Sequence, residues 1–260
     1  MRIRALFDRM AGLPPLVLLT DFGVSDAYVG VMKGVIASVE PALRVIDLTH
    51  GIPPQDVERG AEVLAESWRW FPAGSVFVAV VDPGVGTARR ALVARVGERY
   101  FLGPDNGLIT RIAAQDAVRD VRSMPDTWGL PARSATFHGR DLFAPAAARL
   151  AAGLVAFDDA VATGFIALPE RPPGTVRAID AFGNAITDLP GRPDGLVVWT
   201  PADDRVPVRV SVVGTYADGK AGALVALTGS GGSLELAVPG GSAGIAAGVR
   251  VGDRVRWEPA

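Results

Sequence analysis

The stretch "SVFVAVVDPGVGTARR", residues 75–90, decides the fold. Apart from Ser75, its first seven residues are all apolar, which is too uniform for a strand with one face in water. Such a run is typical of a parallel strand that is covered by helices on both faces. Asp82 follows this run directly, before a Pro-Gly turn. Because ligands of open α/β sheets bind beyond the carboxyl ends of the strands, the candidate site begins here as well.

The segments around this strand alternate between strand and helix patterns, as an α/β layered domain with a mostly parallel sheet requires. We expect strands at residues 16–20, 44–49, 75–81, 91–96 and 99–103, and helices at 29–39, 56–70 and from 144 onward. Asp26 and Asp56 are the expected N-caps of the first two helices, and Pro145 fits the first turn of the third. One face of the second helix is apolar, through Val57, Ala61, Leu64 and Trp68.

The pattern changes at "LPERPPGTV", residues 168–176, where three prolines and a glycine are typical of a linker. Helical periodicity is lost beyond it. Short strand patterns follow, separated by turns rich in Gly, Pro and Asp, at residues 175–180, 184–189, 206–213, 223–228, 233–238 and 253–258. This spacing predicts a small β-barrel or sandwich. We therefore predict an N-terminal α/β domain at 1–172 and a C-terminal β-barrel domain at 173–260.

Composition excludes several classes of protein. Hydrophobic residues make up 49% of the 260, which is incompatible with a disordered chain. The net charge of -2 and the scattered basic residues give no reason to expect nucleic acid or an anionic membrane as partner. The lack of cysteine excludes disulfides, thiolate nucleophiles and cysteine-based zinc sites. Charged residues interrupt the segment 2–9, and no apolar run is long enough to span a membrane, so we expect a cytoplasmic protein.

Three acidic residues follow predicted strands: Asp21, Asp82 and Asp105. Together they suggest one shared crevice, whereas each alone is as readily explained as the cap of a turn. The "DPGVG" turn lacks the spacing of a phosphate-binding loop, but its glycines would allow a ligand to approach the backbone. Adjacent arginines such as Arg89 and Arg90 are usually solvated.

The chain has two histidines, too few for a three-histidine metal site. A structural role is favoured for His50, in the turn "LTHGIPP". His138, in "FHGRD", stands in a glycine-flanked loop, where either a structural or a catalytic role is possible. We expect no nucleophile elbow of the GxSxG type, and Ser230 in "GSGGS" does not fit a strand-to-helix turn. Activation of water by Asp, Arg and His side chains remains, without a metal or a covalent intermediate.

A series of motifs carries a resemblance to a known family. In chain order they are "LLTDFGVSDAYVGVMKGVI", "DLTHGIPPQDVERGA", "VVDPGVGTARR", "GPDNGL", "TFHGRDLFAPAAA", "DAFGNAITDL" and "GSLELAVPGGSA". From about residue 16 to 258 the chain resembles the S-adenosyl-L-methionine hydroxide adenosyltransferases, relatives of the fluorinases and chlorinases. The resemblance implies an N-terminal α/β domain and a C-terminal β-barrel. It also implies a homotrimer, with active sites where the N-domain of one subunit meets the C-domain of the next.

The resemblance implies a catalytic set of Asp82, Arg89 and His138. In the halogenating relatives, aromatic residues replace the Asp and the His, so their presence here points to water as the nucleophile. The implied reaction is hydrolysis of S-adenosyl-L-methionine to adenosine and L-methionine by in-line attack on the ribose C5′. No metal and no separate cofactor are implied, because S-adenosyl-L-methionine is the substrate. The alternatives are a halogenase, a non-enzymatic binder of adenosine or S-adenosyl-L-methionine, and a purely structural trimer.

The resemblance also assigns substrate-binding residues, which are Asp21, Phe137, Gly139, Asp180, Asn184, Tyr216 and Ser230. It assigns Asp21 to the ribose hydroxyls, Tyr216 to the adenine ring and Ser230 to the methionine carboxylate. Asp180 and Asn184 match polar contacts to the methionine and adenosyl parts, and Phe137 and Gly139 would line the reaction centre. The fluorinase has an arginine just after the serine, where this chain has Gly231.

Overall fold

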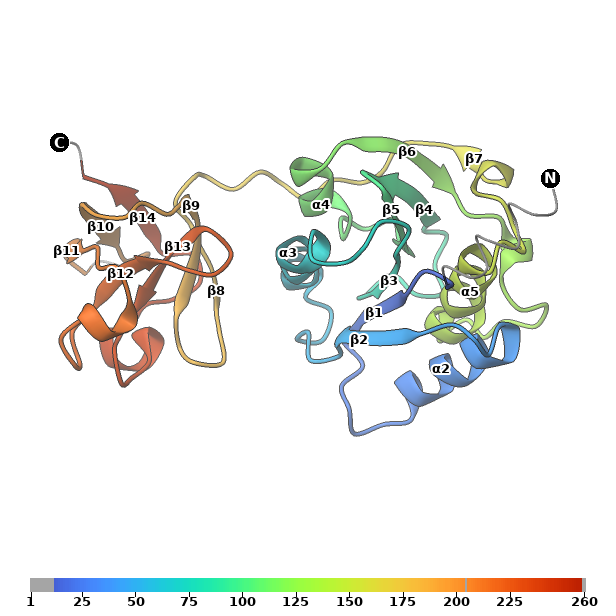
Figure 1. Ribbon diagram of the computed structural model, residues 1–260, viewed down its shortest axis with the longest axis horizontal. Coiled ribbons are helices and arrows are strands. Elements are labelled where there is room, and N and C mark those ends of the chain that lie inside the picture. Colours follow the sequence, from blue (N-terminus) through green and yellow to red (C-terminus); the bar gives the residue numbers. More distant parts are fainter. Residues whose placement is uncertain (1–11, 204, 259–260) are drawn as a thin grey trace. The chain divides into compact units, whose positions relative to one another are not determined.

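The computed structural model describes residues 12–203 and 205–258. They form two compact units, one ending at Leu168 and the other beginning at Pro169, and each unit is described by itself (Figure 1). The division falls in the proline-rich stretch 168–176, next to the predicted boundary at residue 172. Residues 2–9, whose charges contribute to the expectation of a cytoplasmic protein, lie outside the described residues.

The first unit is built on a seven-stranded sheet with the order β2-β1-β3-β5-β4-β6-β7. Its strands are β1 (Leu16–Thr20), β2 (Val45–Thr49), β3 (Val76–Val80), β4 (Ala91–Val96), β5 (Arg99–Pro104), β6 (Val118–Ser123) and β7 (Val161–Ala162). The pairs β1–β2, β1–β3 and β3–β5 are parallel, whereas β4, β6 and β7 join in antiparallel pairs. The parallel half of the sheet was predicted, but strands β6 and β7 were not.

Helices cover both faces of this sheet, as Figure 1 shows. They are α2 (Tyr28–Val39), α3 (Val57–Trp68), α4 (Thr110–Gln115) and α5 (Ala144–Ala151), with shorter turns η1 (Asp126–Trp128), η2 (Gly139–Phe143) and η3 (Phe157–Asp159). The apolar side chains of α2 and α5 belong to one hydrophobic cluster, and those of α3 and α4 belong to the other. The sheet is therefore the middle of three layers.

Strand β3 has apolar side chains on both of its faces, because each face packs against a different layer of helices. Val76, Val78 and Val80 pack in the cluster of α2 and α5, and Phe77 and Ala79 pack in the cluster of α3. All five side chains are buried, which confirms the prediction for this run. Each buried valine or phenylalanine contributes about 1.5–3 kcal/mol relative to an exposed one, so a polar substitution on either face would be costly.

One of the two predicted N-caps is confirmed and the other is wrong. The carboxylate of Asp56 accepts a hydrogen bond from the Arg59 backbone N–H at 2.8 Å at the start of α3. Helix α2 instead begins after Ala27, which already has helical backbone angles and accepts from the Val31 N–H at 2.9 Å. Asp26 therefore precedes the cap position and cannot serve it.

The second unit contains two antiparallel sheets, with the orders β11-β10-β14 and β12-β13-β9-β8. The strands are β8 (Val176–Ile179), β9 (Ala185–Pro190), β10 (Leu196–Thr200), β11 (Val208–Ser211), β12 (Val225–Thr228), β13 (Ser233–Ala237) and β14 (Arg254–Trp257); short turns η4 (Tyr216–Asp218) and η5 (Ala243–Ala247) lie between them. Single-residue bridges, Thr175 to Arg254 and Val212 to Ala226, connect the sheet edges. Among the described residues the strand ladders do not close into one barrel, and β10 was not predicted.

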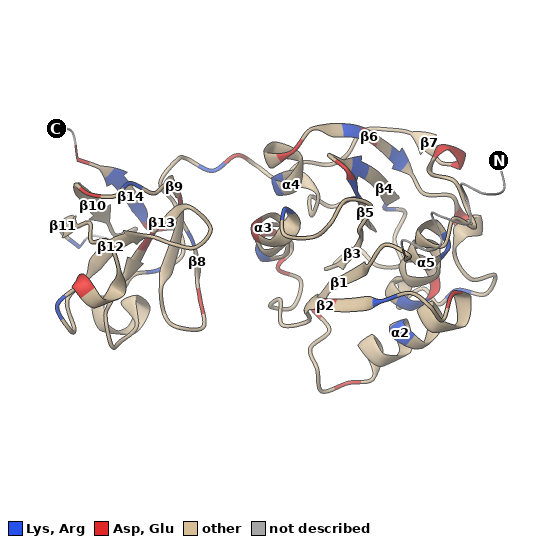
Figure 2. Ribbon diagram, viewed as in Figure 1, with Lys and Arg blue, Asp and Glu red and all other residues tan. Residues whose placement is uncertain are grey.

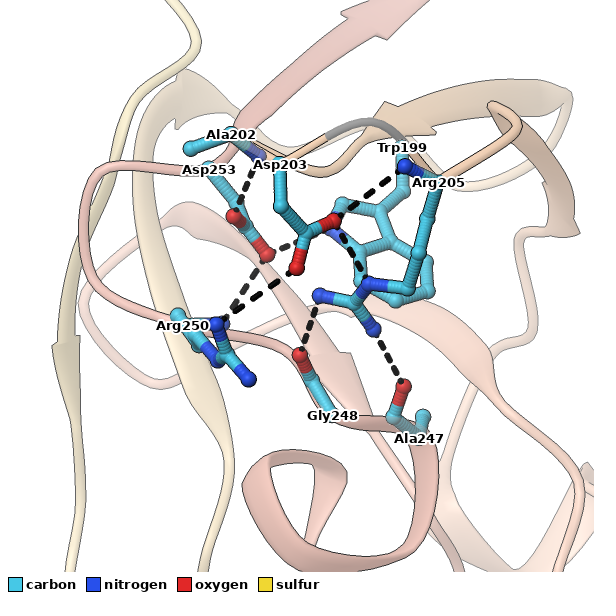
Figure 3. A network of polar contacts seen from close by, with 8 residues as sticks. All are labelled: Trp199, Ala202, Asp203, Arg205, Ala247, Gly248, Arg250 and Asp253. Atoms are coloured by element: carbon cyan, nitrogen blue, oxygen red, sulfur yellow. Dashed lines mark hydrogen bonds and ion pairs between the residues drawn. The ribbon is translucent and has the colours of Figure 1, made fainter.

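A fully buried carboxylate ties the turn before β14 to the end of β10, as Figure 3 shows. Asp253 accepts hydrogen bonds from the Trp199 indole N–H at 2.8 Å, the Ala202 N–H at 2.8 Å and the Arg250 N–H at 2.9 Å. The Arg205 guanidinium lies 5.3 Å from the centre of the Trp199 ring. The Asp253 carboxylate and its three donors thus find their hydrogen-bond partners within the fold, and we interpret this network as one that stabilises the second unit.

Charge is dispersed over both units: Figure 2 shows blue and red segments along many elements rather than gathered on one. In residues 12–203 and 205–258, no helix is both long and apolar enough to cross a membrane.

Candidate active site

The turn after β3 is shaped so that the chain folds back on Asp82. The Asp82 carbonyl accepts from the Val85 N–H at 3.2 Å, and the Gly84 carbonyl accepts from the Thr87 hydroxyl at 2.7 Å. Gly86 has φ +80°, and a Cβ there would lie 2.5 Å from the carbonyl oxygen of Ala135. Only glycine fits such a position, which accounts for the "DPGVG" sequence.

This turn brings Arg89 against Asp82. The guanidinium Nε donates to Oδ1 at 2.9 Å and to Oδ2 at 3.0 Å, and Nη2 also contacts Oδ2. The side chains are only 5% exposed for Asp82 and 10% for Arg89, and the guanidinium lies 5.4 Å from the centre of the Phe143 ring. The two residues form a buried, bidentate ion pair in which each charge depends on the other.

His138 completes the group through Arg89. The Arg89 Nη2 atom lies 2.9 Å from His138 Nδ1. Since a guanidinium can only donate, Nδ1 is the acceptor, and a neutral His138 carries its proton on Nε2. Burial and the neighbouring Arg89 charge lower the pKa of His138, and the Asp82 charge opposes them less strongly. His138 is therefore a neutral imidazole with a defined tautomer at neutral pH.

The "FHGRD" segment is fixed by residues on either side of His138. Asp141 accepts from the Ser134 N–H at 2.8 Å and from Arg140 Nη2 at 2.8 Å, and the hydrogen bonding from Arg140 holds the pKa of Asp141 below its usual value. Gly139 begins η2, and a Cβ there would lie 3.1 Å from the Phe22 ring. The next residue after His138 therefore has to be small for this segment to pack.

Aromatic side chains lie beside the group of Asp82, Arg89 and His138. The ring of Phe137 lies 5.8 Å from that of Phe22 and 5.2 Å from that of Tyr28, both with edge-to-face geometry. They line a cavity of about 310 Å³, which we call the front cavity. Its walls include Asp21, Phe22, Tyr28, Gln55, Asp82, Phe137, His138 and Gly139. Five of the predicted site residues in this unit thus line one cavity, and Arg89 contacts two of them.

Asp21 shapes the rim of the front cavity. Its Oδ2 accepts from the Gln55 backbone N–H at 2.8 Å. Gln55 has φ +65°, a left-handed conformation that is uncommon for residues other than glycine. The nearby His50 is buried, with Nδ1 2.8 Å from the Thr20 hydroxyl and Nε2 3.1 Å from Asp47 Oδ1. His50 thus holds the end of β1 to the end of β2, in agreement with the structural role favoured for it.

The expectation that Asp105 shares this crevice is wrong. Asp105 is 2% exposed and is absent from the front cavity. Its Oδ2 accepts from Arg90 Nε at 2.9 Å, and its Oδ1 accepts from the Ile166 N–H at 2.6 Å. Antiparallel pairing places the start of β4 beside the end of β5, which brings Arg90 to Asp105. The two adjacent arginines are therefore not a solvated pair, because each has its own carboxylate.

The remaining predicted residues lie together in the second unit. They line a cavity of about 690 Å³, whose walls include Asp180, Phe182, Asn184, Tyr216, Ser230 and Glu235. In the "DAFGN" turn, Asp180 Oδ1 accepts from the Phe182 N–H at 2.9 Å and the Asn184 N–H at 2.8 Å. Asp180 therefore builds the turn that carries Asn184 to the wall of the cavity.

A directed chain of hydrogen bonds crosses this second cavity. The Asn184 amide nitrogen donates to Asp180 Oδ2 at 3.1 Å and to the Tyr216 hydroxyl at 3.3 Å, and that hydroxyl donates to Glu235 Oε2 at 2.9 Å. Burial first and Glu235 second raise the pKa of Tyr216 to about 12, so the phenol remains a donor. Sequence reasoning missed Glu235; its one signal is an acidic residue in the middle of the apolar strand β13.

Two models of known protein families match the chain, one in each of its two units. Residues 16–160 match the family model described as the SAM hydroxide adenosyltransferase N-terminal domain, and residues 174–256 match the corresponding C-terminal domain. The chain belongs to the SAM hydroxide adenosyltransferase family. In addition, the residues that the structure describes contain no group of three or more His, Cys, Asp or Glu side chains placed to hold a metal ion.

Two named proteins and one solved structure illustrate what this chain is similar to. An (R)-S-adenosyl-L-methionine hydrolase of Thermus thermophilus is 45% identical over 93% of this chain and 98% of its own. A fluorinase of Actinopolyspora mzabensis is more distant, at 28% identity over 86% of this chain and 90% of its own. A solved structure from Thermotoga maritima, titled an uncharacterized conserved protein, is 33% identical and has a TM-score of 0.87, covering 94% of this chain and all of that one.

Proposed function

We propose that this chain hydrolyses S-adenosyl-L-methionine to adenosine and L-methionine. The observation that carries the proposal is the buried group of Asp82, Arg89 and His138 at the wall of the front cavity. The names of the relatives support the same reaction, because the hydrolase of Thermus thermophilus matches more closely than the fluorinase.

The reaction makes one bond and breaks one bond. The oxygen of a water molecule attacks the ribose C5′, and the C5′–S bond breaks with its electron pair passing to sulfur. The sulfonium becomes the neutral thioether of methionine, and the attacking water loses one proton. Because the sulfonium is already an excellent leaving group, the protein has to supply a positioned and partly deprotonated water rather than an acid.

We infer different roles for the three side chains. Asp82 is an acceptor that orients the water and takes its proton, whereas Arg89 stabilises the developing negative charge on oxygen. His138 acts as a donor through Nε2–H, since its Nδ1 already accepts from Arg89 at 2.9 Å. Proton transfer to a positioned base typically contributes about 10²–10⁴-fold to the rate, and orientation of the water contributes further.

The substrate-binding assignments follow the two cavities. In the front cavity, Asp21 binds the ribose hydroxyls, and Phe137 and Gly139 line the reaction centre. In the second cavity, Asp180 and Asn184 contact polar groups of the substrate, Tyr216 packs on adenine, and Ser230 binds the methionine carboxylate. Their support is that each set lines a single cavity of its own unit.

We further propose a cytoplasmic homotrimer in which the front cavity of one subunit is completed by the second cavity of the next. The second unit would then be a β-barrel closed across the two bridged sheet edges. The trimer is supported by aromatic side chains that are exposed at both cavities, 50% for Tyr28 and 82% for Phe182. Light scattering after gel filtration should give three times the 27.1 kDa of the chain.

The deciding experiment is incubation of purified protein with S-adenosyl-L-methionine in ¹⁸O-water. Adenosine with ¹⁸O at the 5′ position is expected from the native protein, and Asp82→Asn and Arg89→Ala should lose most of this turnover while still binding substrate. Asp26→Asn is the matched control, because Asp26 is exposed and lies outside the front cavity. A chloride- or fluoride-dependent product would support a halogenase instead, and binding without any product would support a sensor.

A further inference from the structure

The first unit has a further cavity, with mostly polar walls, on the other side of the catalytic group. It has a volume of about 530 Å³ and we call it the rear cavity. The wall residues that matter here are Thr87, Arg89, Ser123, Asp126, Arg133 and His138. They come from the turn after β3, the end of β6 and the loop that leads to η2.

The catalytic side chains separate the rear cavity from the front cavity. Asp82 lines the front cavity, Arg89 lines the rear cavity, and His138 lines both. Arg89 links the other two through its contacts with Asp82 Oδ2 and His138 Nδ1. A small molecule in the rear cavity therefore lies next to Arg89 and His138, which contact Asp82 and the front cavity in turn.

The charges around the rear cavity favour water as its content. Its three arginines each have a carboxylate partner: Arg89 pairs with Asp82, Arg90 with Asp105 and Arg133 with Asp126, the last at 2.9 Å. Paired charges leave little net field to hold an anion, and a polar wall is unsuited to an apolar ligand. With about 30 Å³ of liquid volume for each water molecule, the cavity has room for several.

The proposed reaction needs such a compartment. Each turnover consumes one water and releases one proton, while the adenosyl group occupies the front cavity. We propose that the rear cavity supplies the attacking water and receives the released proton, past Arg89 and His138. This inference rests on the proposed hydrolysis. The water oxygen and one of its hydrogens become the 5′ hydroxyl of adenosine, and the other hydrogen leaves as a proton along the waters of the rear cavity.

Filling the rear cavity tests this proposal without touching the catalytic side chains. Ser123→Leu at the end of β6 and Ala135→Leu in the loop before η2 should each displace water from it, because both residues line the rear cavity. The matched controls are Ser123→Ala and Ala135→Ser, which change the same positions but leave the space open. We expect the filled variants to lose about tenfold or more in kcat with little change in KM, and the controls to stay within about twofold of the native protein.

A solvent isotope effect distinguishes supply of water from structural damage. If water delivery or proton release limits the filled variants, their deuterium isotope effect on kcat should rise above that of the native protein. Two positions are used so that a failure of one variant to fold does not decide the outcome. Native kcat in both folded, filled variants would overturn the rear-cavity proposal and leave the hydrolysis intact, as would a loss confined to KM. Lack of adenosine from the native protein would instead overturn the hydrolysis itself.

Discussion

Removing one partner of the Asp82–Arg89 ion pair should destabilise the protein more than removing both. The two side chains are 5% and 10% exposed, and Arg89 Nε lies 2.9 and 3.0 Å from the carboxylate oxygens. Breaking a buried pair on one side costs about 3–5 kcal/mol, because the remaining charge stays desolvated, while replacing both partners is often close to neutral. We expect Asp82→Asn and Arg89→Met each to lose about 3 kcal/mol, and the double variant to lose less than either.

Urea unfolding of the native protein, both single variants and the double variant measures the interaction energy of the pair. An interaction energy of about 3 kcal/mol or more is expected from these values. The exposed pair Asp203–Arg205, whose side chains are 40% and 39% exposed, is the control and should give under about 1 kcal/mol. If the losses at Asp82 and Arg89 simply add in the double variant, the pair is not the buried, mutually dependent unit described here.

Across the native protein and these three variants, turnover should not follow the free energy of unfolding. All three variants lack the arrangement that we propose to orient and activate water, so turnover should fall by about 10²–10³-fold in each, including the more stable double variant. A double variant that regains turnover along with stability would show that Asp82 and Arg89 support the fold alone.

Further predictions concern three other positions. Asp253→Ala should destabilise the second unit by about 3 kcal/mol in urea unfolding, because it strands three buried donors, whereas Asp203→Ala at the surface should stay within about 0.5 kcal/mol. Gly86→Ala should lower kcat and stability together, since φ +80° and a carbonyl 2.5 Å from the new Cβ force the turn to move; unchanged kinetics would contradict this. Because the folded pKa of His138 is lowered, its contribution to stability is complete above about pH 6.5 and is lost as pH falls toward the folded pKa. NMR titration of the His138 ring should therefore show a midpoint below that value.

The layers of the first unit were predictable because its apolar runs have no alternative placement. Strand β3 has five consecutive buried residues, so it had to lie between two layers of helices. Strand β6, "VRDVRS", could not be found in the same way, since only Val121 in it is buried. Its place depends on pairing with β4 and on Arg122, which reaches Asp120 and the Ala160 carbonyl. Such contacts are set by the tertiary structure and leave no periodic pattern.

The clustering of Asp82, Arg89 and His138 was predictable from the sequence, but the order of their contacts was not. The resemblance placed Asp82 and His138 together, and the structure adds that Arg89 lies between them. Local pattern misplaced Asp105, because an acid at a strand end gives no indication of which cation will reach it. Glu235 was missed for a related reason: one acidic residue in an apolar strand does not reveal the tyrosine that donates to it.

In the front cavity and in the second cavity, fixed partners set the direction of the hydrogen bonds. Arg89 can only donate, so it turns the lone pair of His138 Nδ1 toward itself and leaves Nε2–H as the donor of the imidazole. In the second unit, Asp180 and Tyr216 take both hydrogens of the Asn184 amide, which leaves the Asn184 oxygen as an acceptor. In the proposed hydrolysis a water nucleophile needs one acceptor and one donor, and these are the roles that we propose for Asp82 and His138. The Asn184 oxygen matches an amino group, and S-adenosyl-L-methionine carries amino groups on both its adenine and its methionine part.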